Sequence, residues 1–208
     1  MNDGDARGSW ICVDGVEGTG KTTIAEGLAR TLPVELAPEF SAAPFGGALR
    51  DAVKSTPHYI SSSPLGQSLV FLGDFLEVHA SSVAPRLRVG VSVVSDRGYL
   101  SKYAYQHVVL SPTLGVTRTR RLLDEVFTHL PPPTLTIRLT APMQSVRARL
   151  VRRDGSCDRA REEFIALAAE SAAEYLDRTS ELETVTIDTD RPPEEVLHDV
   201  RRIVRRYL

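Results

Sequence analysis

Short apolar runs rich in β-branched residues alternate along this chain with longer segments in which apolar residues recur at helical spacing. The first such pair is an apolar run at 10–14 followed, after a glycine-rich turn, by a helical pattern over 21–31 that includes Ile24 and Leu28. Pro33 ends that pattern. Strands that alternate with helices predict an α/β fold built on a mostly parallel sheet flanked by helices.

The same patterns predict the remaining elements. Five strands are expected, at 10–14, 34–37, 91–95, 134–139 and 184–187. Helices are expected over 21–31, 48–54, 64 to about 85, 101–109, 117–130, 142 to about 153, 161–182 and 194–207, with loops at 42–47 and around Pro112. In the helix that begins at Pro64, one apolar stripe is expected to be buried, and it consists of Leu65, Leu69, Leu72, Leu76 and Val83.

Composition narrows the class of protein. The chain has 208 residues, of which 42% are hydrophobic and 25% charged, and this length fits one domain because domains hold roughly 100 to 200 residues. The formal net charge of −2 provides no global field that would attract nucleic acid or an anionic membrane. We therefore expect neither as a partner, and any anion-binding surface must be local.

Cysteine usage and hydropathy indicate a compartment. Cys12 and Cys157 are too few for a disulfide framework, which favours a reducing environment. Residues 1–8 are polar, carry Asp3 and Asp5, and are expected to be flexible rather than a secretory signal. No apolar run approaches the roughly 20 residues that cross a bilayer. The expectation is a soluble, cytoplasmic protein.

The most informative segment follows the first strand. It fits the phosphate-loop pattern G-x-x-x-x-G-K-[ST] between a strand and a helix, and a glycine turn of purely structural use would have to match this context by chance. Inward-facing backbone N–H groups would bind phosphates, Lys21 would reach the β- and γ-phosphates of ATP, and the Thr22 hydroxyl would ligate Mg²⁺. The predicted ATP-binding residues are Gly15, Val16, Glu17, Gly18, Thr19, Gly20, Lys21, Thr22 and Thr23. Regulatory GTPases, motor ATPases and small-molecule kinases share such a loop, so it leaves the reaction open.

Four further segments narrow the choice. The block DRGYLSKYAYQ at 96–106 resembles the D-R-Y-x-x-S-x-x-A-Y-Q block of the thymidylate kinase family, with a glycine substitution or one extra residue after the arginine. The phosphate loop and the segment LVFLGDF at 69–75 are similar to the corresponding segments of that family. Arg149, Arg153 and the pair Asp158-Arg159 look like its arginine helix and lid. The resemblance covers nearly the whole chain, over 10–208.

This resemblance implies a three-layer P-loop NTPase fold with a five-stranded sheet and an arginine-bearing lid at about 150–162. It implies transfer of the γ-phosphoryl group of ATP to a deoxynucleoside monophosphate, either dTMP or a pyrimidine analogue. Lys21, Arg97, Arg149 and Arg153 would be the catalytic residues, and Thr22 and Asp96 would hold the metal. A lid bearing Arg159 and Arg161 would cover the transferring group. The family also suggests a homodimer formed through the helix near 69–83.

The acceptor site follows from the same resemblance. Its expected residues are Glu17, Glu39, Arg50, Phe71, Phe75, Arg97, Ser101, Tyr105 and Gln106, while Lys102 stands where a polar residue helps to reject ribose. Phe75 replaces a base-contacting arginine of the family, so Phe71 and Phe75, which share a helix face, would clamp a planar ring; alternatively Phe75 belongs to the core. The identity of the base stays open.

Two alternatives remain at this stage. The family's R-E-P motif is replaced here by Pro38-Glu39-Phe40, which keeps the carboxylate and loses the arginine. A hydroxyl acceptor needs no such arginine, so Glu39 would then be the general base of a nucleoside or small-molecule kinase. The loss of two family arginines also fits a protein that binds nucleotide without efficient transfer.

Overall fold

The computed structural model describes residues 8–55, 63–179 and 182–208. Within these residues, five strands form one parallel sheet in the order β2-β3-β1-β4-β5. The strands are β1 (Trp10–Gly15), β2 (Val34–Ala37), β3 (Ser92–Asp96), β4 (Leu135–Thr140) and β5 (Thr184–Asp188). The predicted α/β fold with a five-stranded sheet is confirmed, whereas the expected flexibility of 1–8 falls, for 1–7, outside the described residues.

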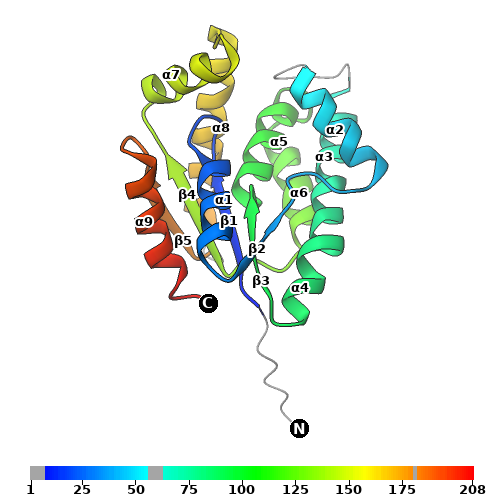
Figure 1. Ribbon diagram of the computed structural model, residues 1–208. Helices are drawn as coiled ribbons and strands as arrows, with labels where there is room; N and C mark the ends of the chain where they lie inside the picture. The colour runs from blue at the N-terminus through cyan, green and yellow to red at the C-terminus, as the bar shows by residue number, and fades with distance from the viewer. Residues whose placement is uncertain (1–7, 56–62, 180–181) are drawn as a thin grey trace.

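Helices cover both faces of this sheet (Figure 1). The helices are α1 (Lys21–Thr31), α2 (Pro44–Ser55), α3 (Pro64–Val78), α4 (Ala84–Arg88), α5 (Tyr99–Leu114), α6 (Val116–Phe127), α7 (Met143–Asp154), α8 (Arg159–Arg178) and α9 (Pro193–Val204), with a π-helical turn η1 (His79–Val83) between α3 and α4. Helices α1 and α9 pack on one face, and α3, α5, α6 and α8 pack on the other. The result is a three-layer arrangement.

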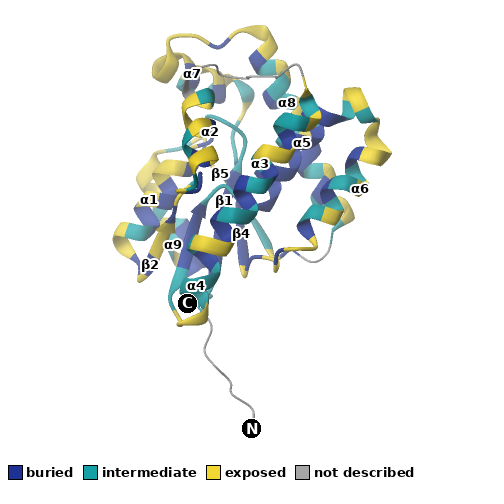
Figure 2. Cartoon of the chain, turned by 90° about the vertical axis from the view of Figure 1, so that its right-hand side faces the viewer, coloured by how far each residue is buried: buried dark blue, intermediate teal, exposed yellow. Residues whose placement is uncertain are grey.

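The two faces of β1 supply two separate cores. Successive side chains of a strand point to opposite faces, so Trp10 and Cys12 pack beneath α3 and α5, while Ile11 and Val13 pack beneath α1 and α9. All four side chains are at most 2% exposed. Figure 2 shows the buried sheet between its exposed helical surfaces. A strand buried on both faces reads as a continuous apolar run, as this one does.

The carboxyl ends of β1 and β3 lie together, because Val13 pairs with Asp96 in a parallel register. The carboxylate of Asp14 is buried and accepts N–H hydrogen bonds from Gly98 (2.8 Å) and Ser101 (3.0 Å) at the start of α5. A Cβ on Gly98 would lie 2.4 Å from Cys12 Sγ, which explains the glycine that follows Arg97. The strand ends and the first turn of α5 therefore form one packed unit.

Several predicted boundaries and one predicted face are wrong. Helix α2 begins at Pro44, so part of the expected 42–47 loop is helical, and α5 continues through Pro112 to Leu114. The helical segment that starts at Pro64 also passes Pro85, because the π-helical turn precedes it and Pro85 lies in the first turn of α4, where no intrahelical N–H is needed.

The expected apolar stripe of α3 is not buried throughout. Leu65 and Leu69 are 37% and 48% exposed, while Leu72 is buried. Helix α3 packs against α5 with a different face, which contains Ser68, Leu72, Phe75 and Val78. The packing partner α5, which the α3 sequence alone does not identify, selects that face. No helix among the described residues has the length and apolar character that crossing a membrane requires.

Candidate active site

The phosphate loop connects β1 to α1, and two of its side chains hydrogen-bond to its own backbone. Gly18 and Gly20 have φ values of 80° and 91°, a region that favours glycine. The carbonyl oxygen of Val16 accepts hydrogen bonds from Thr19 Oγ1 (2.7 Å) and Lys21 Nζ (2.8 Å). Because α1 begins directly after Gly20, its positive N-terminal end faces the loop. This geometry fits the phosphates of a nucleotide.

Lys21 is the cation of this loop. Its side chain is 6% exposed, and burial together with the nearby Arg97 guanidinium lowers the pKa of Lys21 to about 7. Its hydrogen-bond partner is a neutral carbonyl, and the carboxylates of Asp96, Glu39 and Asp14 act on it only from a distance, so a triphosphate would give the ammonium a direct anionic partner.

Thr22 and Asp96 form a pair suited to a hard cation. Thr22 Oγ1 donates to Asp96 Oδ2 at 2.5 Å, and Asp96 Oδ1 is buried without a hydrogen-bond partner in the described part of the chain. Mg²⁺ prefers oxygen ligands and usually binds through one or two protein oxygens plus phosphates and waters. Among the described residues no group of three or more His, Cys, Asp or Glu side chains could hold a metal by itself. The two residues therefore fit Mg²⁺ held together with a nucleotide.

Arg97 and Glu39 face each other beside this pair. Arg97 Nε donates to Glu39 Oε1 at 2.5 Å, and the guanidinium lies over the Tyr105 ring, 5.4 Å from its centroid. Arg97 has a φ of 82°, an unusual value for a residue with a side chain. Burial raises the pKa of Glu39, but Arg97, Lys102 and Lys21 outweigh it and lower that pKa. Glu39 is therefore a paired carboxylate.

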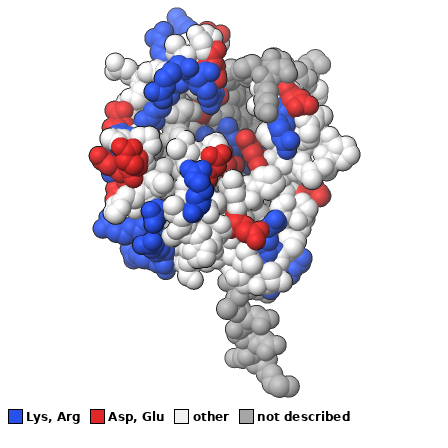
Figure 3. All heavy atoms as spheres, viewed as in Figure 1, with Lys and Arg blue, Asp and Glu red and all other residues white. Residues whose placement is uncertain are grey.

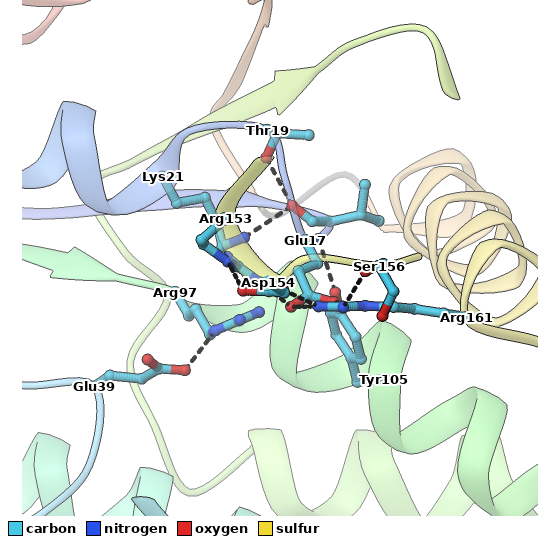
Figure 4. Close-up of polar contacts among 11 residues, drawn as sticks. Glu17, Thr19, Lys21, Glu39, Arg97, Tyr105, Arg153, Asp154, Ser156 and Arg161 are labelled. Carbon is cyan, nitrogen blue, oxygen red and sulfur yellow. Dashed lines mark hydrogen bonds and ion pairs between the residues drawn. The ribbon is translucent and has the colours of Figure 1, made fainter. Parts of the chain in front are cut away.

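Arg153, in the last turn of α7, and Arg161, in the first turn of α8, both contact the phosphate loop. Glu17 Oε1 accepts from Arg153 Nη2 and Arg161 Nη2, both at 2.6 Å, and Asp154 Oδ2 accepts from the same two groups at 2.8 Å (Figure 4). The Arg161 side chain is only 7% exposed. Two carboxylates and two guanidinium groups thus connect the predicted lid to the loop.

Two other arginines lie apart from this cluster. Arg149 donates to the Gly18 carbonyl (3.2 Å) and to the Thr189 carbonyl (2.5 Å), so it braces the outer side of the loop. It does not line the cleft described below, whereas Arg153 does, and the catalytic role expected of Arg149 stays a prediction. Arg159 is 92% exposed and pairs with Glu163 on its own helix, so the lid presents Arg161 rather than Arg159.

A cleft of about 440 Å³ opens beside the loop and receives most of the predicted acceptor residues. Its charged and polar lining includes Glu17, Thr22, Glu39, Arg97, Arg153 and Arg161. Its apolar lining includes Phe40, Val53, Phe71, Val109 and Phe164, and the neighbouring Phe40 and Phe71 rings form its aromatic part. Ser101, Lys102, Tyr105 and Gln106 of α5 also line it. Figure 3 shows a hollow with basic and acidic side chains on its floor.

Two of these α5 side chains also hold the phosphate loop. Tyr105 Oη accepts from the Glu17 backbone N–H at 2.9 Å, and Ser101 Oγ donates to the Gly15 carbonyl at 3.2 Å. These hydrogen bonds fix the position of the cleft relative to the loop.

Two predicted acceptor residues are misplaced. Phe75 is 4% exposed and packs in the core against Tyr99 and Phe127, so it forms no clamp with Phe71, and the core alternative is correct. Arg50 lies on the exposed side of α2 and does not line the cleft, because neighbouring Leu49 occupies the buried side. Arg97 is left as the cation nearest Glu39.

Sequence reasoning missed six contributors. Phe40, Val53, Gln67, Val109 and Phe164 line the cleft, and Asp154 lines it too and pairs with Arg153 and Arg161. Phe164 follows Arg161 by three residues and so shares its helix face, which is a usable signal. Phe40 and Asp154 carry no comparable local pattern.

The structure combines a phosphate-binding loop with an adjacent cleft that can hold a second substrate. This combination defines the class of protein: a P-loop enzyme that transfers a phosphoryl group between two bound substrates. Comparison with known proteins gives the family. The profile of the family described as thymidylate kinase matches residues 13–200. The chain therefore belongs to the thymidylate kinase family and is a nucleoside-monophosphate kinase.

Individual relatives agree over nearly their full length. The probable thymidylate kinase of Pyrobaculum aerophilum is 30% identical over 202 residues, covering 96% of this chain and 98% of that protein. The probable thymidylate kinase of Archaeoglobus fulgidus is 30% identical over 205 residues, covering 95% of each. The solved structure of a thymidylate kinase from Candida albicans matches with a TM-score of 0.73 at 21% identity, covering 97% of this chain and 92% of that one, which shows a shared fold.

Proposed function

We propose that this chain uses ATP and Mg²⁺ to phosphorylate dTMP to dTDP. The observation that carries the proposal is the junction of two sites: Lys21 and the Thr22–Asp96 pair lie at the phosphate loop, and Arg97 lies next to them in the acceptor cleft. Family membership supports a deoxynucleoside monophosphate as the acceptor.

Each group of site residues would have its own role in the reaction. Backbone N–H groups of 15–22 and Lys21 would bind the ATP phosphates, and Thr22 and Asp96 would hold Mg²⁺, which neutralises charge on the transferring group. Arg97 would bind the acceptor phosphate, while Arg153 and Arg161 would exchange Glu17 for the transferring phosphoryl group. Phosphoryl transfer needs positioning and charge neutralisation, which these groups supply.

The nucleoside part of the acceptor would occupy the aromatic part of the cleft. Phe71 lies at its wall, 6.5 Å from Phe40 between ring centroids, and offers a face for stacking. Glu17, Ser101 and Tyr105 would lie between the base and the phosphates.

The hydroxyl-kinase alternative is not favoured. Glu39 is held by Arg97, and burial of a guanidinium in the cleft suits an anionic acceptor better than a neutral hydroxyl. A coupled ADP-release assay with dTMP, dUMP, dCMP, dGMP and thymidine tests the proposal. Turnover with dTMP is expected. Turnover with thymidine alone would restore Glu39 as a base, and ATP binding without any turnover would indicate a non-transferring protein.

We also propose a cytoplasmic homodimer. Leu69 and Val70 are 48% and 45% exposed on α3, and a second copy packing there would cover both side chains. Sedimentation of the purified protein tests this, and replacing Leu69 by Glu should shift a dimer toward monomer. A monomeric wild-type protein at micromolar concentration would contradict it.

A further inference from the structure

Lys102 is a buried cation whose role the proposed phosphate chemistry does not use. Its side chain lies on α5, is 6% exposed and lines the acceptor cleft. Among the described residues its ammonium forms no hydrogen bond and no ion pair within 4 Å, although the carboxylates of Glu39, Asp74 and Asp14 act on it from further away. Its ammonium lies 5.4 Å from the centroid of the Phe40 ring and 5.7 Å from that of Phe75. These rings offset part of the cost of burying the charge, but an ammonium has three N–H donors that still need acceptors.

Gln106 lies one helical turn further along α5 and carries a buried acceptor atom that also needs a partner. It is 5% exposed and lines the same cleft, and its Oε1 atom is buried with no hydrogen-bond partner among the residues that the structure describes. Residues four apart lie next to each other on a helix surface, so donor and acceptor are neighbours. Buried polar groups in a native fold are nearly always satisfied, and a pair left open in a cleft points to a ligand that satisfies both.

The position of this pair assigns it to the base rather than to a phosphate. Lys102 contacts Phe40, and Phe40 contacts Phe71, so the pair belongs to the aromatic part of the cleft. The phosphates have cations of their own in Lys21, Arg97, Arg153 and Arg161. A planar ring against Phe71 would direct its polar edge toward α5.

We propose that Lys102 and Gln106 read the hydrogen-bonding edge of the acceptor base and select a carbonyl oxygen next to a ring N–H. This inference rests on the proposed function and adds the residues that set its specificity. Thymine and uracil offer that edge: the carbonyl oxygen accepts from Lys102, and the ring N–H donates to Gln106. Cytosine, in the same orientation, presents an amino group and an unprotonated nitrogen, so the hydrogen bond to Lys102 is lost and the one to Gln106 forms only if the amide turns over.

Lys102 is the decisive member of the pair. A glutamine amide can turn over and present its NH₂ group, whereas a lysine ammonium only donates. An amino group facing it would leave a buried charge unpaired, which rejects that base as well as failing to bind it.

The test compares dTMP with 5-methyl-dCMP, which has the same shape and differs only at this edge. Steady-state kinetics would be measured for the wild type, Lys102→Met, Lys102→Arg and the control Ser111→Ala, which removes a polar group from the same helix outside the cleft. Lys102→Met should raise KM for dTMP by about 10- to 100-fold, the effect of one hydrogen bond to a charged group. It should reduce the preference for dTMP over 5-methyl-dCMP by a similar factor and leave KM for ATP unchanged.

Lys102→Arg should keep part of the preference because it keeps the charge, and Ser111→Ala should keep all of it. Should Lys102→Met fold poorly, N3-methyl-dTMP probes the wild type directly, and its KM should be at least tenfold above that of dTMP. A folded Lys102→Met variant with an unchanged preference, or equal use of dTMP and N3-methyl-dTMP by the wild type, would overturn the inference. Wild-type protein that does not phosphorylate dTMP at all would instead refute the proposed function.

Discussion

Arg161 of α8 binds the carboxylate of Glu17 in the phosphate loop through two nitrogen atoms: Nη2 lies 2.6 Å from Oε1, and Nε lies 3.2 Å from Oε2. Burial raises the pKa of Glu17, but hydrogen bonds from Arg161 and Arg153 outweigh it, and the pKa is lowered. A carboxylate in this bidentate arrangement holds the guanidinium in place while no phosphate is bound. Glu17 therefore takes the place of a phosphate anion and keeps Arg153 and Arg161 beside the loop.

Replacing Glu17 by Gln should loosen the lid. The variant loses charge-assisted hydrogen bonds to two arginines, so backbone amides of 155–161 should exchange about tenfold faster in hydrogen-exchange mass spectrometry. Glu163→Gln is the matched control, because Glu163 pairs with the 92% exposed Arg159 and should change exchange little. Equal exchange in wild type and Glu17→Gln would show that the lid is held by packing alone.

Replacing Asp96 by Asn should weaken the use of magnesium. Asparagine removes the negative charge next to Thr22 while keeping the shape, so kcat should fall by about 10- to 100-fold at fixed Mg²⁺. The Mg²⁺ concentration that gives half-maximal rate should rise, which an ADP-release assay across a magnesium series would measure. Asp190→Asn is the control, since Asp190 bonds Ser145 on the exposed surface. A normal magnesium response in Asp96→Asn would remove Asp96 from the metal site.

Nucleotide affinity should fall as the pH rises above 7. The pKa of Lys21 is about 7 in the free protein, so the side chain is largely neutral at higher pH. A bound polyphosphate stabilises the charged form and raises that pKa, so binding above pH 7 takes up a proton and becomes weaker as protons become scarce. Calorimetry in buffers of different ionisation enthalpy at pH 6 and pH 8 would show uptake mainly at the higher pH. The same uptake at both values would contradict the assignment.

Phe71 and Phe75 should respond differently to the same substitution. Phe75→Ala should reduce the free energy of unfolding by about 3–5 kcal/mol because it empties a core site beside Tyr99 and Phe127. Phe71→Ala should cost much less stability, yet it should raise KM for dTMP by about tenfold through lost stacking. Urea unfolding and steady-state kinetics together separate the two. A large KM effect for Phe75→Ala in a stable protein would put Phe75 back in the cleft.

The sequence is informative where function depends on neighbouring residues. The phosphate loop could be predicted because the glycines, Lys21 and Thr22 act within eight positions of one another and need only a strand before them and a helix after them. The strands could be predicted because a parallel sheet buries both faces and leaves continuous apolar runs.

It is less informative where two distant elements must meet. Phe71 and Phe75 are four residues apart on one helix, and only the packing of α3 on α5 decides that the first reaches the cleft and the second the core. The ion pair between Arg161 and Glu17 joins residues that are 144 positions apart. Arg149 and Arg153 show the same limit, because their spacing is correct while their partners differ.

The buried carboxylate of Asp14 connects the carboxyl end of β1 to the first turn of α5 through three backbone N–H groups, those of Gly98, Leu100 and Ser101. The phosphate loop and the part of the cleft lined by α5 are consequently joined at their base, and they cannot move apart there without breaking those bonds. We therefore expect movement that brings the two substrates together to come from α7 and α8, which carry Arg153 and Arg161. The extent of that movement would set the in-line separation of the reacting oxygen and phosphorus.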